Sequence, residues 1–113
     1  MGKDYHAAVL DLARRLRGTY GERLARLVAF GSHARGDATE DSDIDILVVL
    51  RIAPQEEPRE RTRVWDEATS TMNARPGLFA PLSIFVFSEA TFSDMKRREI
   101  RFASEIEREG VPL

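Results

Sequence analysis

Three short apolar runs constrain the fold of this chain most, because segments of a different periodicity separate them. The runs are Leu24–Phe30, Ile44–Leu50 and residues 78–87, and the second is dense in β-branched side chains. Runs of this length and composition are typical of buried strands and are too short for ordinary helices. Pro81, inside the third run, cannot donate a backbone hydrogen bond. We therefore expect the early part of that strand to lie at a sheet edge or a bulge.

Helical periodicity marks the segments between these runs. Residues 4–17 and 58–73 repeat apolar side chains at helical spacing, with glycine or proline soon after each pattern ends. A last helix is expected to follow Ser88, a favourable N-cap residue, and to reach Glu109 before Gly110. Strands that alternate with helices predict an α/β or α+β fold in which helices cover a small sheet. The length of 113 residues predicts one domain over residues 1–113.

The composition narrows the possible functions. The chain has no cysteine, which excludes disulfides and thiolate zinc sites, and no apolar run approaches membrane-spanning length. A formal net charge of -2 gives no positive field that would attract a polyanion, so direct nucleic-acid binding is not expected. Arginines and glutamates alternate over residues 97–109, a pattern typical of a solvated helix face with local ion pairs. We expect a cytoplasmic protein.

The stretch between the first two runs carries most of the readable chemistry. Gly31 lacks a Cβ and lets the backbone approach a phosphate, while Ser32 adds a hydroxyl and an N–H group beside it. Arg35 can neutralise a phosphate through two parallel hydrogen bonds. Asp43 and Asp45 alternate along a strand, so both carboxylates should point to one exposed face. Like charges this close repel each other, and one or two Mg²⁺ ions with a bound triphosphate would supply the missing positive charge.

Other interpretations of the same residues can be tested on the sequence. The glycine spacing matches a Walker A loop, but Asp37 stands where that loop needs lysine. An EF-hand fails because Ile46 takes its glycine position. His6 and His33 are too few and too scattered for a histidine metal site, and we expect both to be ordinary surface residues. A polar turn that binds nothing, followed by an ordinary strand, remains an alternative.

A longer pattern connects these residues. It consists of Gly31-Ser32, ten intervening residues that include Ala34-Arg35-Gly36, and then Asp43-x-Asp45 at the start of an apolar run. This pattern resembles the signature of the minimal nucleotidyltransferases of the DNA polymerase β-like superfamily. The resemblance implies a small mixed sheet flanked by helices, and Mg²⁺-dependent transfer of a nucleoside monophosphate from ATP or another NTP to a hydroxyl. It implies that Gly31 and Ser32 hold the triphosphate, and that Asp43 and Asp45 are the catalytic, metal-binding residues.

The resemblance also bears on partners and on catalytic competence. Many members of this family pair with a small helical HEPN-type protein and act as the antitoxin of a toxin–antitoxin system, some by adenylylating the partner. Active members place a third acidic residue on the next strand, where this chain has Ser83, a poor metal ligand and a weak base. Glu89 has the strand parity of Ser83 but stands beyond the expected strand end, and a compensating role for it lacks support.

Three functions are therefore considered. The first is a metal-dependent nucleotidyltransferase that moves AMP from ATP to a hydroxyl on a partner protein. The alternative is a catalytically degenerate, nucleotide-binding antitoxin that neutralises a HEPN-type partner by binding it. A weaker third is a stand-alone regulatory nucleotide binder.

Overall fold

One mixed sheet lies at the centre of the protein. The computed structural model describes residues 3–38, 43–74 and 82–113, and in this part the strands are β1 (Leu24–Phe30), β2 (Ile44–Leu50), β3 (Leu82–Ser88) and β4 (Val111–Pro112). Their order in the sheet is β3-β2-β1-β4. β2 is antiparallel to β1 and parallel to β3, and β4 is antiparallel to β1. The expected small mixed sheet flanked by helices is confirmed.

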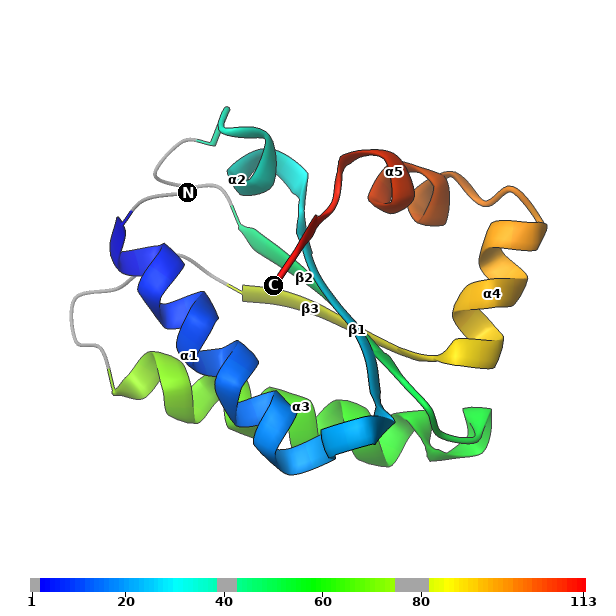
Figure 1. Ribbon diagram of the computed structural model, residues 1–113, viewed down its shortest axis with the longest axis horizontal. Coiled ribbons are helices and arrows are strands. Elements are labelled where there is room, and N and C mark those ends of the chain that lie inside the picture. The colour runs from blue at the N-terminus through cyan, green and yellow to red at the C-terminus, as the bar shows by residue number, and fades with distance from the viewer. Residues whose placement is uncertain (1–2, 39–42, 75–81) are drawn as a thin grey trace.

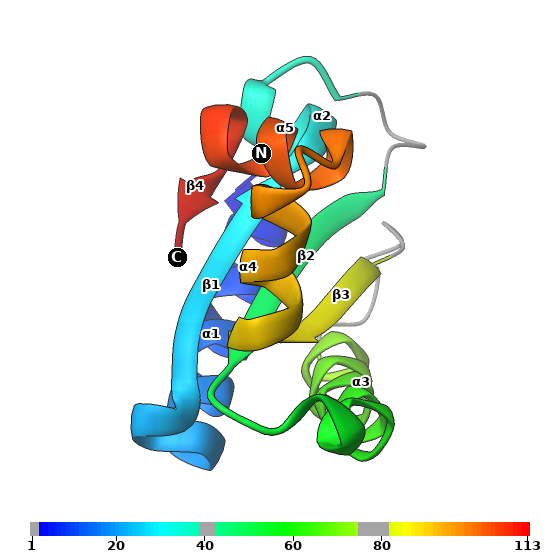
Figure 2. The same cartoon turned by 90° about the vertical axis from the view of Figure 1, so that its right-hand side faces the viewer.

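Helices cover both faces of this sheet (Figures 1 and 2). The helices α1 (Lys3–Tyr20) and α3 (Glu57–Asn73) lie on one face, and α4 (Glu89–Arg97) and α5 (Arg101–Glu109) lie on the other. A short helix, α2 (Gly31–Arg35), directly follows β1, and the 3-10 turns η1 (Gly21–Arg23) and η2 (Pro54–Glu56) complete the described elements. Of the helices in these residues, none has the length and apolar character needed to cross a membrane.

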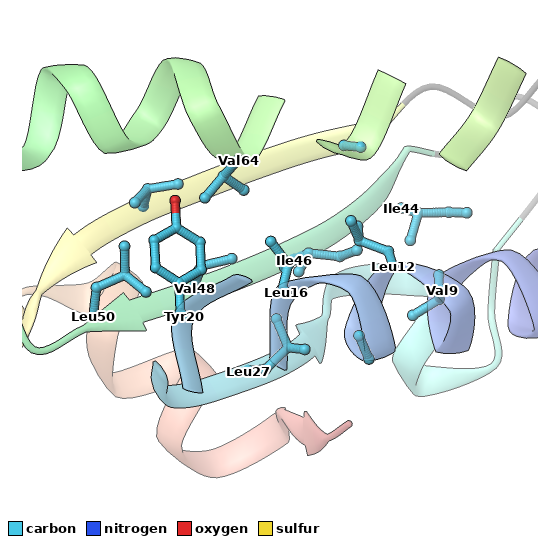
Figure 3. Packing of buried hydrophobic residues seen from close by; sticks show 13 residues of the cluster. Val9, Leu12, Leu16, Tyr20, Leu27, Ile44, Ile46, Val48, Leu50 and Val64 are labelled. Atoms are coloured by element: carbon cyan, nitrogen blue, oxygen red, sulfur yellow. The ribbon is translucent and has the colours of Figure 1, made fainter. Parts of the chain in front are cut away.

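β2 is buried on both faces, which explains why its sequence reads as a continuous apolar run. Ile44, Ile46 and Val48 pack against α1 and α3 in one hydrophobic cluster (Figure 3). Leu47 and Val49 point the other way and pack against α4 and α5. Helices near the C-terminus thus cover this face at Leu47 and Val49, whereas at its beginning Asp43 is exposed and Asp45 is partly buried.

The described boundaries confirm most of the expected elements and correct others. The first two strands have the expected bounds. The third begins at Leu82 within the described residues, and Pro81 lies outside them, although β3 is an edge strand as expected. The turn after Phe30 is a short helix. β4 was not expected, because a two-residue strand has no periodicity and depends on its pairing with β1.

The expected single C-terminal helix is wrong, because the chain forms two helices. Ser88 is the N-cap of the first, and its hydroxyl accepts a hydrogen bond from the backbone N–H of Thr91. The helix ends at Arg97, and Glu99 adopts a positive φ of 54° that no α-helix continues. The break lets α5 turn back over the sheet, where Ala103 and Ile106 join the same cluster as Phe92.

Candidate nucleotide site

The candidate site lies where β1 ends and β2 begins. In the antiparallel register Phe30 is opposite Asp45, so the first residues of α2 lie beside that carboxylate. Gly31 has a φ of +79°, and a Cβ on it would stand 2.2 Å from Oδ2 of Asp45. Any other residue at position 31 would adopt an unfavourable positive φ, and its Cβ would displace the Asp45 carboxylate.

The structure brings Asp43, Asp45 and Ser83 together at the same end of the sheet. Ser83 is paired with Asp45 in the parallel register between β2 and β3. Its hydroxyl donates a hydrogen bond to Oδ2 of Asp43 at 3.0 Å. Ser83 therefore lies directly beside the two carboxylates.

Burial and charge act together on Asp45. Its side chain is half-buried, and this burial raises the pKa of the carboxyl above its ordinary value, with the charge of Asp43 raising it further. His33 and Arg35 lower the pKa of Asp45 and offset part of the effect. An ionised Asp45 is thus poorly compensated by the protein itself, which favours a cation at this position.

A pocket of about 320 Å³ opens beside Asp45. It is lined by one end of β1, the start of α2, one residue of β2 and one side of α5: Phe30, Gly31, Ser32, Arg35, Asp45, Glu105 and Glu109. The volume is at the lower end of the range for small-molecule sites. Sequence reasoning missed the contribution of Glu105 and Glu109, because nothing in the local pattern indicates that α5 packs beside α2.

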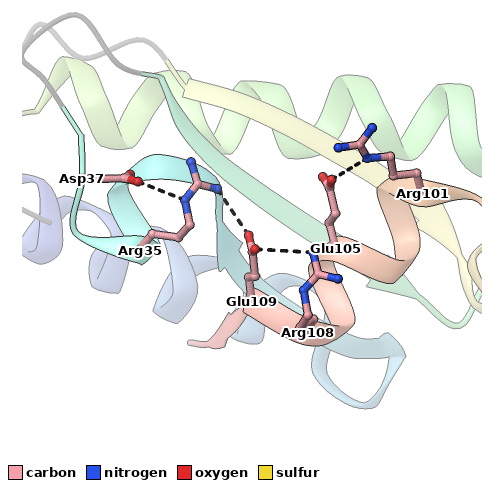
Figure 4. Close-up of polar contacts among 6 residues, drawn as sticks. All are labelled: Arg35, Asp37, Arg101, Glu105, Arg108 and Glu109. Atoms are coloured by element: carbon pink, nitrogen blue, oxygen red, sulfur yellow. Dashed lines mark hydrogen bonds and ion pairs between the residues drawn. The ribbon is translucent and has the colours of Figure 1, made fainter.

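Arg35 is shared between two carboxylates at this pocket (Figure 4). Its Nε lies 3.3 Å from Oδ2 of Asp37, and its Nη1 lies 3.3 Å from Oε2 of Glu109. Farther along α5, Arg101 pairs with Glu105 at 2.8 Å. The expected ion pairs of the C-terminal region are confirmed, and their glutamates Glu105 and Glu109 also line the pocket. A phosphate entering it would have to replace carboxylates as the partners of Arg35.

Two expectations about nearby residues are corrected. His33 is only 6 % exposed, so it is not a surface residue, whereas His6 is exposed as expected. His33 lies in the middle of α2, which packs against the sheet. Glu89 follows Ser88 at the far end of β3, roughly 17 Å along the strand from Ser83. There it pairs with Arg51, so within one chain it does not replace the missing third acid.

The two carboxylates fit a metal ion that arrives with a nucleotide. Among the described residues, no group of three or more histidine, cysteine, aspartate or glutamate side chains is arranged to hold a metal. Mg²⁺ in nucleotide sites is usually bound by one or two carboxylates together with phosphate oxygens and water. Asp43 and Asp45, with the raised pKa of Asp45, fit that arrangement.

A small mixed sheet with a glycine–serine turn beside two carboxylates at the start of a strand is the architecture expected of a nucleotidyltransferase. Residues 11–108 match the family model described as the nucleotidyltransferase domain, and the chain belongs to this family. A crystal structure described as a "putative nucleotidyltransferase from Sulfolobus solfataricus" has the same fold, with a TM-score of 0.52 at 19% identity over 99% of this chain and 87% of that chain.

Shorter matches connect the chain with proteins of Methanocaldococcus jannaschii named "Putative protein adenylyltransferase". It is similar to MJ0604, with 48% identity over 42 residues, which are 37% of this chain and 42% of that protein. It is also similar to MJ0141, with 46% identity over 33 residues, which are 29% of this chain and 33% of that protein. The chain thus matches less than half the length of these relatives.

Proposed function

We propose that this chain transfers AMP from ATP to a hydroxyl on a partner protein, and that Mg²⁺ accompanies the nucleotide. The observation that carries this proposal is the contact between Gly31 and Asp45, where a missing Cβ leaves room for a carboxylate directly beside the pocket. The names of the similar proteins support adenylyl transfer to protein.

In this proposal the residues of the turn hold the triphosphate. The backbone of Gly31 and the N–H and hydroxyl of Ser32 bind phosphate oxygens, because both residues line the pocket next to Asp45. Arg35 exchanges Glu109 for a phosphate oxygen, since a guanidinium pairs with either anion through the same N–H groups. The displaced Glu109 repels the phosphates, which limits affinity for nucleotide that carries no cation.

Asp43 and Asp45 would hold Mg²⁺. When bound, the ion supplies positive charge that polarises the phosphate and lowers the pKa of an attacking hydroxyl. Ser83 keeps Oδ2 of Asp43 oriented through its hydrogen bond but provides no strong base. Activation of the acceptor would thus depend on the two aspartates, and we expect turnover to be slow.

The proposal is tested with ATP labelled on the α-phosphate, Mg²⁺ and a HEPN-type protein encoded beside this chain. Label should move to that protein with the wild-type chain and not with Asp45→Asn. Asp66→Asn is the matched control, because Asp66 is an exposed carboxylate on α3 that does not line the pocket. Absence of transfer with any divalent metal would exclude catalysis.

The same site also supports a second candidate, a nucleotide-binding antitoxin without turnover. The observation that favours it is Ser83, which occupies the position beside Asp45 and Asp43 where a third carboxylate would be needed. In that case the double variant Asp43→Ala/Asp45→Ala should still neutralise the partner toxin. If the missing acid alone limits catalysis, Ser83→Asp should instead increase label transfer.

A further inference from the structure

The two edges of the sheet differ in how well they are protected from pairing with a strand of another molecule. β4, at one edge, has only two residues, and one of them is Pro112, so it offers few groups for pairing. β3, at the other edge, has seven residues with the sequence LSIFVFS and carries no charged side chain. No other strand of the described residues pairs with its outer side. A long, uncharged, apolar edge of this kind attracts another strand unless something covers it.

An apolar groove runs beside this edge, between α3 and β3. Its volume is about 330 Å³, and it is lined by Arg61, Thr62 and Trp65 of α3 and by Ile84 and Val86 of β3. Trp65 is 53% exposed, although tryptophan is costly to leave in water. Arg61 is also exposed. Both side chains are thus available to an outside partner.

The two sides of the groove have matching residue spacings, and this match indicates which molecule binds there. α3 and β3 run in opposite directions, because Glu57 at the start of α3 accepts a hydrogen bond from Thr91, which follows the end of β3. Arg61 therefore lies toward Val86 and Trp65 toward Ile84. The four-residue helical step between Arg61 and Trp65 is about 6 Å. The two-residue strand step between Ile84 and Val86 is about 7 Å, nearly the same length.

In a symmetric pair of copies that places Ile84 of one copy opposite Val86 of the other, Arg61 of one copy would therefore also lie opposite Trp65 of the other. We propose that β3 pairs antiparallel with β3 of a second copy of this chain about an axis near Phe85, and that Arg61 of each copy stacks on Trp65 of the other. Such a surface is complementary to itself, as a symmetric dimer requires. A guanidinium over an indole ring is a favourable contact. The resulting continuous sheet would remove the exposed β3 edge, and this proposal does not depend on the proposed enzymatic function.

The single tryptophan of the chain makes the proposal directly measurable. Sedimentation velocity should show the 12.8 kDa chain converting to a species of twice that mass as the concentration rises. A standard interface has a Kd of micromolar or tighter, so conversion should be complete by about 200 µM. Over the same range the emission of Trp65 should move to shorter wavelength, because stacking removes the indole from water.

Substitutions of exposed residues test the contact itself. Arg61→Glu and Trp65→Ala should each raise the dimer Kd by at least about 30-fold, as expected for residues at the centre of an interface. Arg101→Glu and Ile100→Ala are the matched controls, because both residues are exposed and lie away from the groove. They should leave the Kd unchanged. Far-UV circular dichroism should show that all four variants remain folded.

Two results would overturn the proposal. A chain that stays monomeric at about 200 µM, with constant tryptophan emission, would show that a different protein covers the β3 edge, if anything does. A dimer whose Kd is the same for the wild type, Arg61→Glu and Trp65→Ala would place the interface elsewhere on the molecule.

Discussion

Replacing Gly31 by alanine separates backbone strain from the contact with Asp45. Gly31 and Gly36 both have a positive φ of nearly the same size, +79° and +83°. A Cβ on Gly36 meets nothing within 4 Å, whereas a Cβ on Gly31 stands 2.2 Å from Oδ2 of Asp45. Gly36→Ala therefore measures the cost of the left-handed conformation alone, and Gly31→Ala measures that cost together with displacement of the carboxylate.

The two costs can be worked out from these geometries. A left-handed conformation costs an alanine about 1–2 kcal/mol. Relief of the 2.2 Å contact requires the Asp45 carboxylate to rotate away from its preferred angle, which adds about 0.5–1.5 kcal/mol. Gly36→Ala should thus lower the free energy of unfolding by about 1–2 kcal/mol and Gly31→Ala by about 1.5–3.5 kcal/mol. For a domain of this size each kcal/mol lowers Tm by roughly 4–8 °C.

A double-mutant cycle isolates the contact. In Asp45→Ala, only the Cβ of residue 45 remains, 3.5 Å from the new Cβ at position 31, which is an ordinary distance. The additional cost of Gly31→Ala should disappear in that background when unfolding is measured with urea. Equal costs for Gly31→Ala and Gly36→Ala, or the same additional cost with and without the Asp45 carboxylate, would refute the reasoning.

The cycle has a functional counterpart. Gly31→Ala should abolish Mg²⁺–ATP binding in calorimetry, because the rotated Asp45 carboxylate no longer faces the pocket. Gly21→Ala is the control, since Gly21 also has a positive φ with open space around it and lies at the opposite end of β1. Retained binding in Gly31→Ala would show that the position of Asp45 does not matter for the nucleotide.

Three further substitutions test other features of the fold. The raised pKa of Asp45 means that its ionised form opposes folding, so Asp45→Asn should raise Tm at neutral pH. This gain should disappear as the pH falls through the raised pKa toward that of an unfolded aspartate, and a gain independent of pH would contradict it. Tyr20→Phe removes a 2.9 Å hydrogen bond to Glu60, which is 1% exposed, and should cost about 1–3 kcal/mol in urea unfolding; no measurable change would contradict it. Ser88→Ala should lower the free energy of unfolding by about 1 kcal/mol through loss of the α4 cap. Ser93→Ala, at an exposed position in the middle of α4, should leave the free energy of unfolding unchanged. Equal effects of the two substitutions would exclude the cap.

The sequence by itself determined the features that depend on neighbouring residues. The bounds of β1 and β2 follow from their apolar runs, and the start of α4 follows from a serine at a favourable cap position. The grouping of Asp43 with Asp45 follows from strand alternation. Ser83 was a candidate because of the family resemblance, and it lies beside Asp43 and Asp45 in the structure. The family match confirms the class that this local pattern indicated.

Tertiary structure decided what surrounds those residues. Glu109 lies 74 positions from Arg35 in the sequence, and the two meet only because a break near Glu99 turns α5 back over the sheet. His33 is buried where α2 packs against the sheet, and α4 and α5 cover Leu47 and Val49 on the other face of β2. Such contacts depend on how helices pack on a sheet, and periodicity within a short segment carries no information about them. The sequence thus predicted the two aspartates, whereas packing set the pocket, the partners of Arg35 and the raised pKa of Asp45.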